Sequence, residues 1–260
     1  IAANIFKRTI IVGAERCNPK AHIKKERIRM KIVMPLCDGF IFQTKGARSY
    51  YNDKIKCKSA IIGNIAPAPD KIVVMSEGTV KDVCTVGRLC KYKDFGTLLK
   101  AFVLVVEQVS DAKLHIYGEG DELDNLMALS EKLGISDNVI FEGFCKKMPE
   151  EYLKYEIFVF SSKSEGMPNV LLEAMASGVA CISSDCDFGP ADLIEDGKNG
   201  ILVPIEDSMA LSNAMLLLMQ NKELRSALGR EAAKISEIYS EENVISKYIR
   251  FLSCLRIMNS

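Results

Sequence analysis

Residues 164–178 of this 260-residue chain read SEGMPNVLLEAMASG, and the prediction of the fold follows from this stretch. Pro168 has the fixed φ that suits the first turn of a helix, and Gly178 has the freedom that suits its end. Glu165 then lies in the loop before the helix, and Glu173 lies one to two turns inside it. Free backbone N–H groups lie between the two carboxylates, which favours a bound phosphate there.

The two glutamates have two interpretations. An ionised carboxylate only accepts hydrogen bonds, so sugar hydroxyls suit it as partners and phosphate oxygens do not. Spacing alone fits a solvated amphipathic helix equally well. The preceding residues 156–161 (EIFVFS) form the apolar run of a buried parallel strand. Because α/β sheets bind ligands at the carboxyl ends of their strands, this context favours a binding site.

Short apolar runs alternate with helical patterns after a linker that contains Pro67 and Pro69. We expect strands at 83–87, 113–117, 138–142, 156–161, 179–183 and 200–203. We expect helices at 94–108, 121–133, 149–155, 168–177 and 190–195, and a helical segment over 208–255 with breaks near Asn221 and Tyr239. This strict alternation predicts the α/β class, with a parallel sheet covered by helices on both faces.

Before the linker the pattern gives only three strands. They are expected at 9–13, 39–43 and 59–62, with helices at 22–34 and 44–52. Three strands are too few for a doubly wound domain, so we expect the chain to lack the beginning of its first domain, as a fragment would. The predicted units are residues 1–66, the end of an N-terminal Rossmann-like domain, and residues 67–260, a complete Rossmann-like domain with C-terminal helices.

Charge and rare residues narrow the class of protein. Lys plus Arg equals Asp plus Glu at 34 each, so no overall basic field attracts nucleic acid. The strongly basic stretch from Lys20 to Lys31 is interpreted as a solvated or membrane-facing helix surface. Nine cysteines without a CxxC pair are interpreted as reduced, mostly buried thiols of a cytoplasmic chain. The two histidines, His22 and His115, argue against a Ser-His-Asp triad or a histidine-ligated metal.

Charged residues also follow other predicted strands. Arg88 and Lys93 lie in the loop after the first strand of the second unit. Such a pair can neutralise a diphosphate, although two surface charges would fit the same pattern. Asp185 and Asp187 form a D-x-D pair, but the glycine and proline that follow favour a turn that caps a helix over a metal site.

Four elements together resemble the family-4 retaining glycosyltransferases, which have the two-domain GT-B fold. They are Gly87-Arg88 with Lys93, the E-x7-E element from Glu165 to Glu173, Ser184-Asp185-Cys186 with Gly189-Pro190, and residues 196–204 (DGKNGILVP). Residues 38–44 and 62–64 resemble the end of the family's first domain. Residues 14–19 resemble a Ser-Glu-Arg-Asn type segment, from which Ala14 and Cys17 depart.

The resemblance implies an activity and its partners. It implies transfer of a hexose or N-acetylhexosamine, with retention, from a nucleotide sugar (usually a UDP-sugar) to a glycan or lipid-linked acceptor in surface polysaccharide synthesis. No metal or other cofactor is expected, and no nucleic acid. The enzyme is expected in the cytoplasm, in peripheral contact with the inner face of the membrane.

The resemblance also implies roles by position. Arg88 and Lys93 would hold the diphosphate and Glu165 the sugar hydroxyls, and these three form the predicted catalytic set. Glu173 would hold the ribose. The other predicted donor-binding residues are Gly87, Gly143, Phe144, Gly166, Met167, Asn169, Val170 and Leu171. No covalent nucleophile is obvious, so we favour a front-face mechanism in which the leaving phosphate helps to take the acceptor's proton.

Two other classes stay open. A nucleotide-sugar epimerase of the same fold is disfavoured, because its acid–base chemistry usually uses histidines and the two here are poorly placed. A non-catalytic subunit would bind the donor and transfer nothing, and a chain without a complete first domain would behave in this way.

Overall fold

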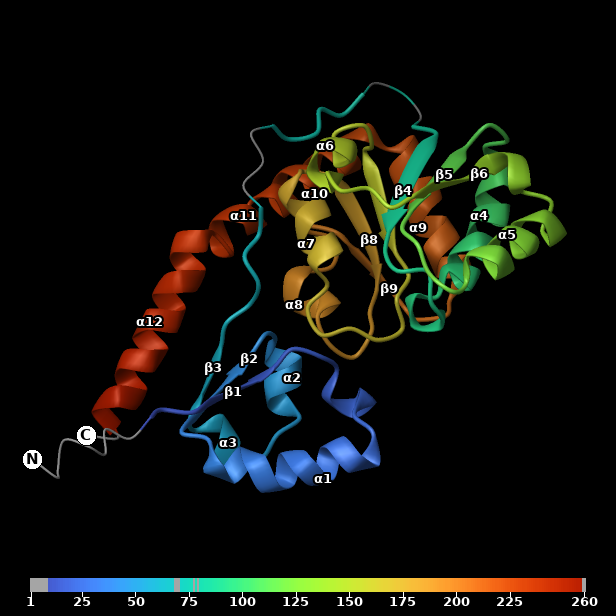
Figure 1. Ribbon diagram of the computed structural model, residues 1–260. Helices are drawn as coiled ribbons and strands as arrows, with labels where there is room; N and C mark the ends of the chain where they lie inside the picture. The colour runs from blue at the N-terminus through green and yellow to red at the C-terminus, as the bar shows by residue number, and fades with distance from the viewer. Residues whose placement is uncertain (1–8, 68–70, 77, 79, 259–260) are drawn as a thin grey trace, which may run out of the picture.

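Two separate parallel sheets form the frame of the computed structural model, which describes residues 9–67, 71–76, 78 and 80–258 (Figure 1). The smaller sheet has the strand order β1-β2-β3, and the larger has the order β6-β5-β4-β7-β8-β9. The predicted α/β class is confirmed. Some residues of the two predicted units lie outside the described ranges, namely 1–8, 68–70 (with the linker residue Pro69), 77, 79 and 259–260.

The smaller sheet is built from the first part of the chain. Its strands are β1 (Val12–Glu15), β2 (Gly39–Phe42) and β3 (Ser59–Ile61). Its helices are α1 (Lys24–Val33), α2 (Lys45–Ser49) and α3 (Asp53–Lys56), with 3-10 turns at Pro19–Ala21 and Met34–Leu36. The predicted helix at 44–52 is therefore shorter than expected, because Asn52 caps a separate turn of helix by accepting from the Ile55 N–H group.

The larger sheet contains the predicted alternation of strands and helices. Its strands are β4 (Asp82–Val86), β5 (Lys113–Tyr117), β6 (Val139–Gly143), β7 (Ile157–Phe160), β8 (Ala180–Ser184) and β9 (Ile201–Val203). The helices are α4 (Phe95–Gln108), α5 (Leu123–Lys132), α6 (Met148–Tyr152), α7 (Asn169–Ala176), α8 (Pro190–Leu193), α9 (Ser208–Gln220), α10 (Lys222–Ala233), α11 (Ile235–Ile238) and α12 (Glu241–Met258). Each lies within about three residues of its expected place.

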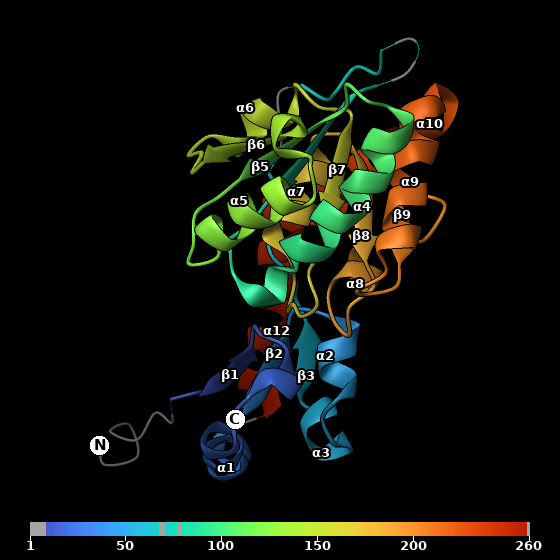
Figure 2. The ribbon, with the colours of Figure 1, turned by 90° about the vertical axis from the view of Figure 1, so that its right-hand side faces the viewer.

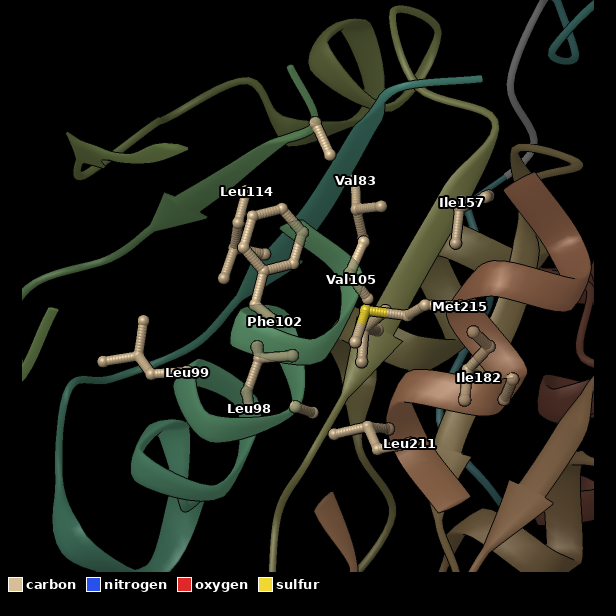
Figure 3. Close-up of a cluster of buried hydrophobic side chains, with 14 of the residues drawn as sticks. Val83, Leu98, Leu99, Phe102, Val105, Leu114, Ile157, Ile182, Leu211 and Met215 are labelled. Carbon is tan, nitrogen blue, oxygen red and sulfur yellow. The ribbon is translucent and has the colours of Figure 1, made fainter. Parts of the chain in front are cut away.

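The main core lies between the larger sheet and helices α4 and α9. Apolar residues on α4 recur at helical spacing, and Leu98, Phe102 and Val105 are fully buried. Figure 3 shows them converging with Met215 of α9 and with the strand residue Val83. Full burial of such a side chain contributes about 1.5–3 kcal/mol. A second apolar cluster, which includes residues of α6 and α7, covers the opposite face of the sheet, as predicted.

The strand order places a reversal between β4 and β7. From β4 the chain adds strands in one direction to β6, and it then returns to add β7, β8 and β9 on the other side. The loops that leave β4 and β7 therefore lead to helices α4 and α7 on opposite faces of the sheet. The carboxyl ends of two such strands are where α/β sheets usually bind ligands, and we call this place the crevice. Both predicted catalytic loops begin there.

Helix α12 returns to the smaller sheet, although the prediction placed it with the second unit. Val244 packs in one buried cluster with Ile41 and Ile62 (Figures 1 and 2). A Cβ atom on Gly39 would lie 2.5 Å from Leu255 Cδ1, so the contact is close. Sequence periodicity predicts the apolar side of a helix but does not say which sheet covers it.

The free thiols are less buried than expected. All nine cysteines are free, and only Cys37, Cys84, Cys181 and Cys186 are buried.

Among the described residues, no helix has the length and apolar character needed to cross a bilayer.

A buried ion pair joins the amino ends of the strands, at the edge opposite the crevice. Arg225 of α10 is fully buried, and its Nε donates to Glu156 Oε2 at 3.0 Å. The same guanidinium donates to the carbonyls of Leu218 and Met219 at 2.7 and 3.0 Å, and to that of Gly78 at 3.2 Å. It therefore ties the end of α9 and the linker to β7.

We predict that Arg225→Leu destabilises the protein strongly. The substitution leaves Glu156 without its cation and several carbonyls without donors, which typically costs about 3–5 kcal/mol. Urea unfolding would measure it. In the control Lys234→Leu, which removes an exposed ion pair with Glu231, little change is expected. Equal unfolding midpoints for wild type and Arg225→Leu would contradict the prediction.

Candidate active site

Hydrogen bonds join the loops that leave β4 and β7. Ser161 Oγ donates to the Lys93 carbonyl at 2.9 Å, and the Lys163 N–H group donates to the Tyr92 carbonyl at 2.8 Å. Lys163 Nζ also lies 3.6 Å from Asp94 Oδ1. The two loops therefore hold their side chains as one structure across the strand-order reversal.

An ion pair lies at the centre of these loops. Lys93 Nζ is 2.6 Å from Glu165 Oε1, and the two side chains are only 13% and 12% exposed. Ser162 Oγ donates to the same oxygen at 2.5 Å, and Nζ lies 4.9 Å from the centre of the Phe160 ring. In such a desolvated place each charge needs the other. The structure thus brings together a predicted cation and a predicted carboxylate that are 72 residues apart.

Arg88 lies beside a cavity of about 380 Å³ rather than in the ion pair. The cavity is lined by Val86, Gly87, Arg88, Tyr117, Gly118, Glu119, Phe144, Cys145 and Met148. Phe144 is 71% exposed at its edge. A Cβ atom on Gly118 would lie 1.9 Å from the Gly87 carbonyl oxygen, so only glycine permits this approach. Predicted residues from the β4 and β6 loops therefore share one cavity.

The start of α7 has the free donors that the sequence predicts. Pro168 is the N-cap, and the first bond of the helix runs from the Leu172 N–H group to its carbonyl at 3.1 Å. The N–H groups of Asn169, Val170 and Leu171 have no acceptor in the described part of the chain. Since the Leu171 side chain is fully buried, it offers a ligand only its backbone.

Glu173 is a half-buried carboxylate on the same helix. Within the residues that the structure describes, its side chain makes no hydrogen bond or ion pair. Burial raises its pKa above the ordinary value of 4.5. A desolvated carboxylate without a partner can accept hydrogen bonds from the hydroxyls of a ligand.

Gly166 and Met167 contact the smaller lobe, by which we mean the smaller sheet with its helices and loops. A Cβ atom on Gly166 would lie 2.4 Å from the Arg16 carbonyl oxygen, so this loop tolerates no side chain. Met167 is buried, and its sulfur accepts from the Asn64 N–H group at 3.2 Å. Their contribution to donor binding stays a prediction.

The hydrogen bonds of the Asn64 side chain were not predicted from the sequence. Its Oδ1 accepts from Arg16 Nη2 at 3.0 Å and from Gln43 Nε2, and its Nδ2 donates to Asn169 Oδ1 at 2.5 Å. The side chain therefore links the smaller lobe to the first residue of α7. Residues 62–64 were interpreted only as the end of the first domain. A polar amide side chain at the start of the linker was the feature that could have indicated a contact between the lobes.

Glu15 lies at the carboxyl end of β1 and is buried with two partners. His22 Nε2 lies 2.7 Å from its Oε2, and the Tyr51 hydroxyl donates to the same oxygen at 2.7 Å. Burial alone would lower the pKa of His22, but hydrogen bonds and charge from Glu15 and Glu26 outweigh burial and raise it. Glu15 is therefore engaged in holding the smaller lobe together.

The two lobes also meet at the loop before α8. Phe188 is buried among apolar residues of the smaller lobe that include Phe40 and Phe42. Asp192 Oδ1 accepts from the Lys45 N–H group at the start of α2, at 2.8 Å. Asp187 of the D-x-D pair forms an ion pair with Lys20 at 2.9 Å. Among the described residues, no group of three or more histidine, cysteine, aspartate or glutamate side chains could hold a metal ion.

Residues 71–235, which span the larger sheet and the crevice, match the family model described as glycosyl transferases group 1. The chain belongs to this family. This group 1 family member is similar to an uncharacterized glycosyltransferase of Haemophilus influenzae, to which it is 28% identical over 220 residues. That match covers 84% of the chain and 62% of the relative. It is 30% identical over 177 residues to the poly(ribitol-phosphate) alpha-N-acetylglucosaminyltransferase of Staphylococcus aureus, which covers 67% of the chain and 36% of that protein.

A solved structure confirms the GT-B fold of this glycosyltransferase. A point mutant of S. aureus TarM, in a complex that contains UDP, superposes with a TM-score of 0.84 at 24% identity. The superposition covers 94% of this chain and 51% of TarM. The chain therefore spans about half of TarM and 62% of the H. influenzae relative.

We predict that Glu173→Gln stabilises the ligand-free protein at neutral pH. Because burial raises the pKa of Glu173 in the folded state, ionisation there opposes folding. Below the ordinary pKa, Glu173 is protonated in both the folded and the unfolded state, so wild type and Glu173→Gln should differ little in pH-dependent stability. The destabilisation of wild type grows as the pH rises and is complete above the raised pKa of folded Glu173. Urea unfolding of both proteins across this pH range would measure the change. A difference that stayed constant with pH would contradict this explanation.

Proposed function

We propose that this glycosyltransferase chain carries the donor site of an enzyme that transfers a hexose or N-acetylhexosamine, with retention, from a UDP-sugar. The proposed acceptor is a glycan or lipid-linked saccharide of surface polysaccharide synthesis, reached from the cytoplasmic side of the membrane. One observation carries the proposal. The Lys93–Glu165 ion pair joins the β4 loop to the β7 loop at the strand-order reversal, and the β7 loop that carries Glu165 leads into the free N–H groups of α7.

The proposed diphosphate site combines three sources of positive charge. Arg88 and Lys93 supply fixed cations, and the start of α7 supplies backbone donors and the positive end of its dipole. Negative charge grows on the diphosphate as the glycosidic bond breaks, so groups already aimed at those oxygens stabilise the transition state more than the ground state. We propose that this stabilisation needs no bound metal.

The glutamates suit the hydroxyls on either side of the diphosphate. Glu165 uses Oε1 for Lys93 and Ser162, and in the described part of the chain its Oε2 makes no hydrogen bond. This oxygen is available to a sugar hydroxyl. Glu173, unpaired on α7, suits the ribose, and the cavity beside Arg88 and Phe144 has room for the base.

We propose a front-face transfer at this site. The acceptor oxygen bonds to the anomeric carbon on the face from which the diphosphate departs, and the bond from that carbon to the phosphate oxygen breaks. The acceptor's proton passes to an oxygen of the leaving diphosphate. The configuration at the anomeric carbon is then retained.

UDP should bind to the wild-type chain in calorimetry without added metal. We expect Arg88→Ala and Glu173→Gln each to weaken binding at least about tenfold, or 1.4 kcal/mol. Arg88→Ala removes a cation, and Glu173→Gln removes a charged acceptor. The matched control is Lys91→Ala, an exposed cation in the same loop, which should bind UDP like wild type. A folded wild type that bound no UDP would contradict the proposed donor site.

Lys93→Met should lower the rate of UDP release from a UDP-sugar by about 10²–10³-fold, the effect of losing one electrostatic contact to the transition state. Released UDP would be measured with UDP-glucose and UDP-N-acetylglucosamine as donors. Lys91→Met serves as the control. Wild-type turnover in Lys93→Met would refute the role of Lys93, and UDP binding without any turnover would favour a non-catalytic donor-binding subunit.

A further inference from the structure

Hydrogen bonds between side chains run from the smaller lobe to the start of α7. Arg16 Nη2 donates to Asn64 Oδ1 at 3.0 Å, and the buried amide of Gln43 donates to the same oxygen. Asn64 Nδ2 in turn donates to Asn169 Oδ1 at 2.5 Å. Side chains that are far apart in the sequence thus form one connected series, which ends at the first residue of α7.

Arg16 fixes the direction of the bonds in this series. A guanidinium has N–H donors and no acceptor, so the Asn64 atom beside it must be the amide oxygen. The amide nitrogen of Asn64 then faces Asn169. Because that nitrogen only donates, the Asn169 atom that it meets must also be the oxygen. The Asn169 amide is therefore held in one of its two orientations, with its Oδ1 occupied.

The other branch of the Asn169 amide is a free donor. Its Nδ2 has no acceptor in the part of the chain that the structure describes. It belongs to the residue whose backbone N–H group, like those of Val170 and Leu171, is free at the start of α7. A helix start of this kind favours an anion, and a further N–H donor strengthens it. A turned amide would instead bring an oxygen, which repels an anion.

The backbone of Asn64 is also held in place. Its N–H group donates to the sulfur of Met167 at 3.2 Å. A Cβ atom on the preceding Gly63 would lie 2.4 Å from Tyr239 Cε1 and 2.8 Å from Met167 Cε, so this part of the linker is tightly packed. The chain leaves β3 here and passes beside α7 (Figure 1). The Asn64 amide is therefore positioned by its backbone as well as by its partners.

We propose that Asn64 is a positioning residue of the donor site, which orients the Asn169 amide so that its Nδ2 donates to the diphosphate. The inference rests on the proposed function, which places the diphosphate at the start of α7. Asn64 itself contacts no part of the donor and acts only through Asn169. The smaller lobe thereby contributes to donor affinity, although the proposed diphosphate contacts all come from the larger one. A movement of the lobes that broke the Asn64–Asn169 bond would release the amide and weaken donor binding.

Aspartate and alanine at position 64 separate positioning from stability. Asn64→Asp still accepts from Arg16 and Gln43 but cannot donate, so Asn169 must turn its Nδ2 toward residue 64 and its oxygen toward the free N–H groups. We expect this variant to weaken UDP binding at least about tenfold, and Asn64→Ala, which only frees the amide to rotate, about threefold. Urea unfolding should give the opposite order, because alanine loses every bond of the Asn64 side chain. The same order in both measurements would overturn the proposal.

A double-mutant cycle tests whether the effect passes through Asn169. In an Asn169→Ala background, Asn64→Asp should change UDP binding by no more than about twofold, because no amide is left to turn. A tenfold loss that persisted there would mean that the new charge acts on UDP directly, and it would refute the positioning role. Asn169→Asp, at an exposed position, keeps the acceptor for Asn64 but loses the free donor. It should weaken UDP binding at least about tenfold, and wild-type affinity in this variant would contradict the proposal.

The matched control is Asn18→Asp. Asn18 also reaches from the smaller lobe to the loop after β7, where its Nδ2 donates to Ser164 Oγ at 2.8 Å. A hydroxyl donates as well as accepts, so Ser164 can reverse this bond and no amide is turned. UDP binding should stay within about twofold of wild type. Equal losses in Asn18→Asp and Asn64→Asp would show that any added charge between the lobes has the effect, and the inference would fail.

The same calorimetry separates this inference from the proposed function. A folded wild type that bound no UDP would remove the proposed donor site and the role of Asn64 with it. UDP binding to wild type that Asn64→Asp left unchanged would count only against the role of Asn64.

Discussion

The ion pair between Lys93 and Glu165 is the contact on which the arrangement of the crevice depends. It joins the loops after β4 and β7, two neighbouring strands from which the chain continues to opposite faces of the sheet. Two charges with this little exposure are stable only together. The pair therefore fixes the β7 loop against the β4 loop, and through that loop it fixes the place where α7 begins.

The geometry of the crevice also depends on the smaller lobe. Gly166, next to Glu165, lies against the Arg16 backbone, and the Asn64 side chain reaches Asn169 at the start of α7. Phe188 extends from the larger lobe into the core of the smaller one. A movement of one lobe would thus strain the loop that holds Glu165, so the relative position of the lobes and the geometry of the site are coupled.

Local patterns explain why so much of the fold could be predicted. Strand and helix ends came within about three residues because apolar periodicity and turn residues act over short segments. Lys93 and Glu165 lie together because the carboxyl ends of parallel strands meet at one edge of a sheet, whereas Arg88 lines a neighbouring cavity. Asn64, Phe188 and the packing of α12 were missed because each depends on a partner far away in the sequence, which no local pattern identifies.

Glu165 and Glu173, the two carboxylates of the proposed site, have different surroundings. Glu165 is compensated in the ligand-free protein by Lys93 and Ser162, whereas Glu173 is desolvated and has no partner among the described residues. Its ionisation opposes folding until something donates hydrogen bonds to it. Under the proposed function, a ribose hydroxyl that donates to Glu173 would remove this opposition, so donor binding would regain the free energy that ionisation of Glu173 costs. A half-buried carboxylate without a partner among the described residues is thus the feature that favours the proposed ribose contact on this side of α7.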